Sequence, residues 1–124
     1  MSTRPEQEFW LFLERLWRGG RAKQVTATLD HEDFQMQTAG RYIQGHALLP
    51  RDYDKICTED IIKMGNLLFK KEVKEETKEA IIMLLAHHSS EVALILLSKY
   101  NLIPDKGLEF FAQMALEECA MWNE

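Results

Sequence analysis

The sequence predicts a single domain built entirely from α-helices. Apolar residues recur at helical spacing in several segments, and pairs such as Gly19-Gly20 and Ser89-Ser90 separate these segments. Residues that favour helix starts precede most of the segments. The length of 124 residues suits one domain, and a composition of 46% hydrophobic and 28% charged residues is typical of a globular protein.

The first predicted helix begins after Thr3 and runs to about Arg18. Thr3 and Glu6 have the spacing of a capping box, Pro5 falls in the first turn, and Gly19-Gly20 would end the helix. Leu11 points away from the apolar face, and Trp10 borders it. The face itself consists of Phe9, Phe12, Leu13, Leu16 and Trp17.

Residues 21–57 leave two interpretations open. Asp30 could cap a helix of about 31–44, in which Phe34, Thr38 and Tyr42 would share a face. The alternation in residues 25–29 would instead suit short strands. We favour the helix, so residues 1–57 form an N-terminal helical part of the domain that ends in a loop after Pro50.

Four further helices are predicted in residues 58–124. Thr58 would cap a helix of about 59–71, which a helix of about 75–88 follows. Ser89 or Ser90 would cap the next helix, which reaches about Tyr100. Asp105 would cap the last, which reaches about Trp122, and the expected total is about six helices.

The chain aligns with itself best at an offset of 32 residues, which pairs Glu59 with Glu91 and Met64 with Leu96. The same offset pairs Ile82 with Met114 and Leu84 with Leu116, so segments 58–88 and 90–122 are two similar helix pairs. Helix pairs at a fixed period indicate an α-solenoid.

The stretch KEETKEAIIMLLAHHSSEVALILLSKYNLIPDKGLEFFAQMALEECAMW resembles HEAT-type repeats, with small alanines at helix crossings and leucine-rich stripes. The resemblance covers the C-terminal half. It implies antiparallel helix pairs stacked as a short HEAT-like solenoid, which acts as a protein–protein interaction scaffold.

Two helices of this half have unusual apolar patterns. The helix of about 91–100 is apolar around nearly its whole circumference, which predicts a central position. The last helix has a core face that includes Leu108, Phe111, Ala112, Ala115, Leu116, Cys119 and Trp122. It also has a second apolar stripe: Phe110, Met114 and Met121. Either the N-terminal half folds back over that stripe, or another chain covers it.

Charge and composition exclude several classes of protein. The net charge of −5 argues against a nucleic-acid binder. No segment has the roughly 20 apolar residues needed to span a membrane, and Glu6, Glu8 and Glu14 interrupt the apolar run that a signal peptide would need. Cys57 and Cys119 form no disulfide framework, so we expect reduced thiols and a cytoplasmic protein.

His87 and His88 are the most suggestive residues for chemistry. Adjacent helical residues diverge by about 100°, whereas metal pairs on a helix sit three or four residues apart. We therefore expect these histidines to close a helix end, and Cys119 to be a buried, inert thiol. The alternative is a small metal- or ligand-binding enzyme that uses His87 and His88 with Cys119.

The sequence favours a non-enzymatic protein–protein interaction module with no cofactor, catalytic residue or metal site. The apolar stripes would bind another protein, and acidic residues beside them would orient a basic partner. Self-association through the same surface would give a homodimer. The expected partner-binding residues are Trp10, Leu11, Phe110, Met114, Met121, Glu117 and Glu118.

Overall fold

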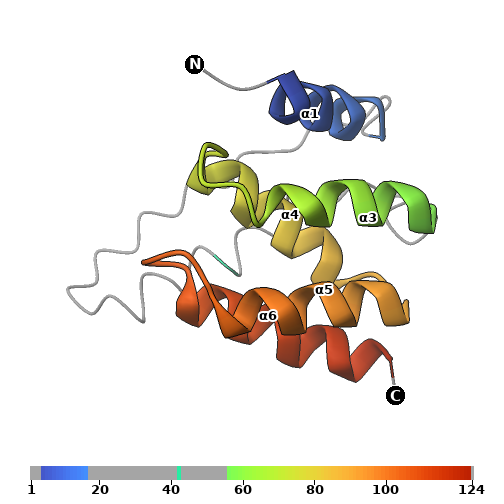
Figure 1. Cartoon of the computed structure of the whole chain (residues 1–124). Helices are drawn as coiled ribbons and strands as arrows, with labels where there is room; N and C mark the ends of the chain where they lie inside the picture. The colour runs from blue at the N-terminus through green and yellow to red at the C-terminus, as the bar shows by residue number, and fades with distance from the viewer. Residues whose placement is uncertain (1–3, 17–41, 43–55, 124) are drawn as a thin grey trace.

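A computed structural model describes residues 4–16, 42 and 56–123, and this part of the chain contains five helices and no strand (Figure 1). The helices are α1 (Arg4–Leu16), α3 (Thr58–Leu67), α4 (Glu75–Ala86), α5 (Glu91–Leu102) and α6 (Glu109–Trp122). The all-α prediction is therefore confirmed for the described residues. The helix expected at about 31–44, and the strands weighed against it, lie outside them apart from Tyr42.

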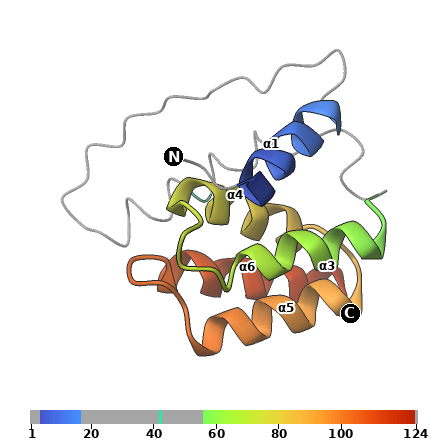
Figure 2. The same ribbon diagram turned by 45° about the horizontal axis from the view of Figure 1, so that its top comes forward.

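Helices α3 to α6 pack closely on one another. α3 contacts α4 and α5, and α6 contacts α4 and α5. Gly65 lets α3 approach α5, because a Cβ at this position would collide with the side chain of Leu96. α1 lies on the other side of the α3–α4 pair from α5 and α6 (Figures 1 and 2).

α1 is held on the start of α4 by buried polar contacts. The Glu6 carboxylate accepts hydrogen bonds from the Thr77 hydroxyl and from the backbone N–H of Lys74, the residue before α4. A carboxylate at this position is also favoured by the positive end of the α4 dipole. Trp10 donates from Nε1 to the same Thr77 hydroxyl at 3.0 Å. Phe9 and Leu13 add buried apolar contacts.

The central helix is α4, not the helix of about 91–100 as the sequence predicted. Nearly every residue from Thr77 to His88 is buried. In α5 the buried residues are Ala93, Leu96, Leu97 and Tyr100, whereas Ile95 is exposed. The apolar pattern of α5 did not predict its position correctly, because α3, α4 and α6 pack on α5 but leave the side that carries Ile95 exposed.

Among the described residues, one of the three predicted side-chain caps is found; Thr3 and Asp30 lie outside these residues. The Ser90 hydroxyl accepts from the backbone N–H of Ala93 at 3.1 Å and caps α5 as expected. Thr58 is the first helical residue of α3 rather than its cap, and the capping position belongs to Cys57. α6 begins at Glu109, so Asp105 is not its N-cap.

Asp105 instead bonds the α5–α6 connection to α4. Its Oδ2 accepts from Nζ of the buried Lys78 at 2.7 Å and from the Tyr100 hydroxyl at 2.6 Å. Partial burial alone would raise the pKa of the Asp105 carboxyl, but the hydrogen bonds from Lys78 and Tyr100 and the charge of Lys78 hold that pKa below its usual value. Burial, and then the bond to Asp105, raises the pKa of the Tyr100 hydroxyl, which therefore stays a donor.

Candidate functional site

The seven residues expected to bind a partner lie on two separate faces. Trp10 and Leu11 belong to α1, and the other five belong to α6. These two helices lie on opposite sides of the α3–α4 pair (Figures 1 and 2). One partner segment therefore cannot contact both groups through a single continuous patch.

The second apolar stripe of α6 becomes more exposed toward the C-terminus. Phe110 and Met114 are half-buried, and Met114 packs against the core. Met121 is 63% exposed and Trp122 is 54% exposed. Trp122 was expected on the core face and is instead at the surface, because it lies one turn beyond Cys119, whose thiol already lies beside the end of α4 at the His88 carbonyl. We call Phe110, Met114, Met121 and Trp122 the α6 flank.

The charge of α6 has one sign. Residues 109–122 include three glutamates and no basic residue. Glu109 and Glu117 are exposed, and Glu118 is half-buried. Glu118 accepts from the Tyr42 hydroxyl at 2.5 Å and lies 2.8 Å from Nε2 of His87. The outward-facing charge of α6 therefore comes from Glu109 and Glu117, while Glu118 serves contacts inside the domain.

Tyr42 is the described residue of the N-terminal part that reaches α6. Its ring packs edge-on against Phe111 with centroids 5.0 Å apart, and its hydroxyl bonds Glu118. Burial, and then the Glu118 carboxylate, raises the pKa of this hydroxyl, which therefore remains a hydrogen-bond donor. The N-terminal part thus contacts the inner side of α6 at this point.

His87 and His88 are buried at the junction of α4 and α5, and both ring nitrogens of each have a hydrogen-bond partner. Nε2 of His88 donates to the Ile56 carbonyl at 2.7 Å, so its Nδ1 accepts from the Ser90 hydroxyl at 2.8 Å. Nδ1 of His87 donates to the Met83 carbonyl at 2.9 Å, and Nε2 faces Glu118. No group of three metal-ligating side chains occurs among the described residues. These contacts join the end of α4 to Ile56, just before α3, and to Glu118 of α6.

The two cysteines differ in their surroundings. Cys119 is fully buried, and burial raises the pKa of its thiol to about 11. Its nearest polar contacts are the His88 carbonyl, 3.8 Å from the sulfur, and the Asn123 amide at 3.5 Å. Cys57 is exposed and donates to Asp60 at 3.2 Å. A neutral, enclosed thiol at Cys119 lacks the properties of a nucleophile.

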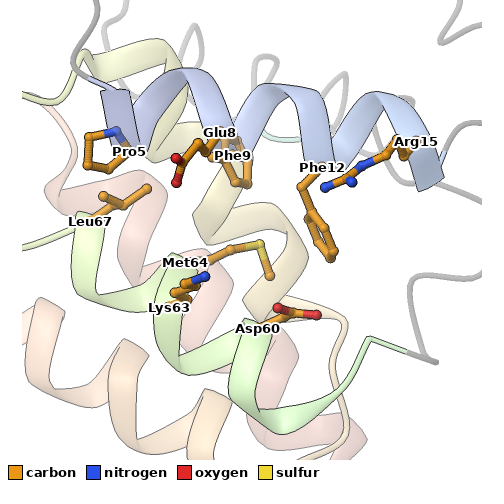
Figure 3. A pocket seen from close by; sticks show the side chains of 9 residues that line it. All are labelled: Pro5, Glu8, Phe9, Phe12, Arg15, Asp60, Lys63, Met64 and Leu67. Atoms are coloured by element: carbon orange, nitrogen blue, oxygen red, sulfur yellow. The ribbon is translucent and has the colours of Figure 1, made fainter.

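A groove of about 380 Å³ lies between α1 and α3 (Figure 3). Its apolar lining includes Phe9 and Met64, which are buried, and Phe12, which is half-buried. Charged side chains stand on both walls: Glu8 and Arg15 on α1, and Asp60 and Lys63 on α3. We call these four residues the groove corners.

The groove was not predicted from the sequence. The apolar face of α1 was recognised, but no groove beside it was expected. Glu8, Phe12 and Arg15 recur at intervals of four and three residues, which places two charges beside an apolar residue on one flank of the helix. That spacing was the available signal, and the facing wall of α3 could not be known without the fold.

Comparison with known proteins identifies no relative: no family model, no curated protein and no solved structure matches this chain. Among the described residues, no helix is both long enough and apolar enough to cross a membrane. The function must therefore be argued from the surfaces themselves.

Proposed function

We propose that the protein is a non-enzymatic protein–protein interaction module that binds a basic, amphipathic helical segment along the α6 flank. The observation that carries the proposal is the combination of exposed apolar side chains and one-sided acidic charge on α6. Met121 and Trp122 are more than half exposed, and α6 has glutamates but no lysine or arginine. Large, clustered apolar side chains at a surface usually indicate an interaction site.

The difference in burial between equivalent positions of α4 and α6 supports this choice of surface. The 32-residue offset pairs Ile82 and Leu84 of α4 with Met114 and Leu116 of α6. The α4 side chains are buried, whereas their α6 counterparts are half-buried. Among the described helices, α6 has fewer packed neighbours than α4, and it retains an apolar flank for a partner.

A HEAT-like arrangement of two stacked helix pairs agrees with this interpretation and forms part of the proposal. The pairs would be α3 with α4 and α5 with α6, and the contacts α3–α5 and α4–α6 are those that such a stack requires. In a stack of this kind each helix pair packs on the next one, and a partner helix on the α6 flank would pack in the same way.

The chemistry of the surface defines the partner. Unbranched methionine side chains adapt to different apolar surfaces, which suits a helix that presents aliphatic residues at i, i+4 and i+7. Glu109 and Glu117 would attract lysine or arginine on the borders of that helix. The overall charge of −5 would add a long-range attraction for a basic segment.

The test is equilibrium binding of a helical peptide of about 15 residues, with leucines at helical spacing and lysines elsewhere. We expect micromolar binding that weakens as salt is added. Met121→Glu should weaken binding at least about tenfold, because it removes an apolar contact. The added negative charge alone would favour the lysine peptide, so a loss of affinity reports on the apolar contact. A peptide with glutamate in place of lysine should not bind.

Leu11→Glu is the matched control. It adds the same charge at an exposed leucine of α1, on the other side of the molecule, and should leave the affinity for the lysine peptide unchanged. Equal weakening by Met121→Glu and Leu11→Glu, or full affinity in the Met121→Glu variant, would remove the α6 flank as the binding site.

A further inference from the structure

The groove between α1 and α3 carries an inference independent of the α6 flank. In Figure 3 the groove corners form a rectangle with alternating signs. Glu8 of α1 stands across the groove from Lys63 of α3, and Arg15 stands at the same end as Asp60. Each wall thus has one acid and one base, in opposite order along the groove.

This arrangement is complementary to itself. If a second copy is turned over about a two-fold axis along the groove, each acid meets a base: Glu8 faces the second copy's Lys63, and Arg15 faces its Asp60. If the axis runs across the groove, Glu8 faces the second copy's Arg15, and Lys63 faces its Asp60. An isologous interface requires a surface that matches its own copy in this way.

The four corner charges are available for such contacts. Glu8, Arg15 and Lys63 are exposed, and Asp60 is half-buried. Among the described residues no ion pair joins the two walls of the groove; Glu8 pairs along α1 with Arg4 at 3.3 Å. A single-signed partner would meet repulsion at two of the four corners, whereas a second copy would meet none.

Leu11 supplies an apolar group beside the groove. It is 58% exposed and lies three residues after Glu8 and four before Arg15, so it stands between the two charges of the α1 wall. The groove lining adds Phe12, Met64 and Leu67 as apolar contacts. If the axis lies along the groove, Leu11 of each copy meets α3 of the other copy; if the axis lies across the groove, the two Leu11 side chains meet. Either arrangement removes Leu11 from water.

We propose that the α1–α3 groove is the interface of a homodimer, in which the groove corners pair across the two-fold axis and Leu11 of each copy is buried against the other copy. The expected strength is modest, because exposed ion pairs contribute little to binding. The dimer should therefore dissociate at micromolar concentration and weaken as salt is added.

The test is sedimentation velocity of the full chain over concentrations from about 1 to 500 µM. The wild type should show a monomer–dimer equilibrium, and Leu11→Glu should raise the dimer dissociation constant at least about tenfold. Glu8→Lys should raise it by roughly three- to tenfold. Met121→Glu, on α6, should leave it unchanged, which separates this interface from the peptide-binding flank.

Two double variants test the charge pattern and determine the axis. If the axis lies along the groove, adding Lys63→Glu to Glu8→Lys restores the dimer; if it lies across the groove, adding Arg15→Glu to Glu8→Lys restores it. Restoration by one of these pairs and not the other supports the proposal. A wild type that stays monomeric would overturn the proposal; this is the result expected if the groove binds a different protein. Failure of both double variants to restore the dimer would also overturn it. Circular dichroism of each variant verifies that the helices remain folded.

Discussion

Helices α4 and α6 have similar apolar patterns but very different surroundings. Ile82 of α4 is fully buried, whereas Met114, its counterpart 32 residues later, is half-buried. Among the described residues, α4 has α1, α3, α5 and α6 as neighbours, whereas α6 packs on α4, α5 and Tyr42. An apolar stripe therefore shows which side of a helix can be buried. Whether that side is buried depends on the neighbouring helices.

The largest expected effect concerns the inner side of α6, where Cys119 is enclosed. A thiol pKa of about 11, against an ordinary value near 8.5, lowers the thiolate fraction at pH 8 by about two orders of magnitude. A thiol reagent should modify the exposed Cys57 rapidly and Cys119 only after unfolding, as mass spectrometry over time would show. Equal rates for both cysteines in the folded protein would mean that α6 is not packed as described.

Alanine substitutions at equivalent positions of α4 and α6 test how much each buried side chain contributes to the free energy of unfolding. Ile82→Ala removes a fully buried side chain and should lower the free energy of unfolding by about 3 kcal/mol. Met114→Ala should lower it by about 1 kcal/mol, because the side chain is already partly in water. Urea denaturation measures both values, and equal losses would show that the two helices are covered equally.

Asp105→Asn tests the ion pair that ties the α5–α6 connection to α4. Lys78 would keep its buried charge without its acidic partner, so the free energy of unfolding should fall by about 2 kcal/mol at neutral pH. Because the folded pKa of Asp105 is lowered, its contribution is present above the unfolded pKa near 4 and is lost as the pH falls through the folded pKa.

The stability difference between the wild type and Asp105→Asn should therefore shrink as the pH is lowered below about 4. Urea denaturation of both proteins at several pH values measures this difference. A gap that does not change with pH over this range would separate the stabilisation from the charge of Asp105.

The smallest effect concerns helix starts. Ser90→Ala removes the side-chain cap of α5 and should lower the free energy of unfolding by about 1 kcal/mol. Part of that loss would come from the bond between Ser90 and His88. The neighbouring exposed Ser89 provides the matched control, since Ser89→Ala should change stability little. A larger loss of stability for Ser89→Ala than for Ser90→Ala would show that Ser89, and not Ser90, caps α5.

Local patterns predicted local features well. A serine cap at Ser89 or Ser90, the burial of Cys119 and the inner face of α6 followed from residue type and helical spacing. Three features depended on tertiary contacts, which residue spacing does not reveal: the central place of α4, the exposure of Trp122 and the groove between α1 and α3. Trp122 shares a face with Cys119, but nothing in the pattern reveals that α4 ends one turn too early to cover it.

The same limit applies to the residues expected to bind a partner. Trp10 and Leu11 were expected to bind a partner together with residues of α6, yet the α3–α4 pair lies between α1 and α6. Glu118 was expected to face a partner, and it instead bonds Tyr42 and contacts His87. Its sequence position beside Glu117 gave no indication of that difference.

Methyl NMR of methionine-labelled protein during titration with the lysine peptide tests the central claim most directly. Met114 and Met121 report on the α6 flank, Met64 on the α1–α3 groove and the buried Met83 on α4. The proposed function predicts that the Met114 and Met121 signals shift while those of Met64 and Met83 do not. Shifts at Met64, with Met114 and Met121 unchanged, would contradict it and assign peptide binding to the groove.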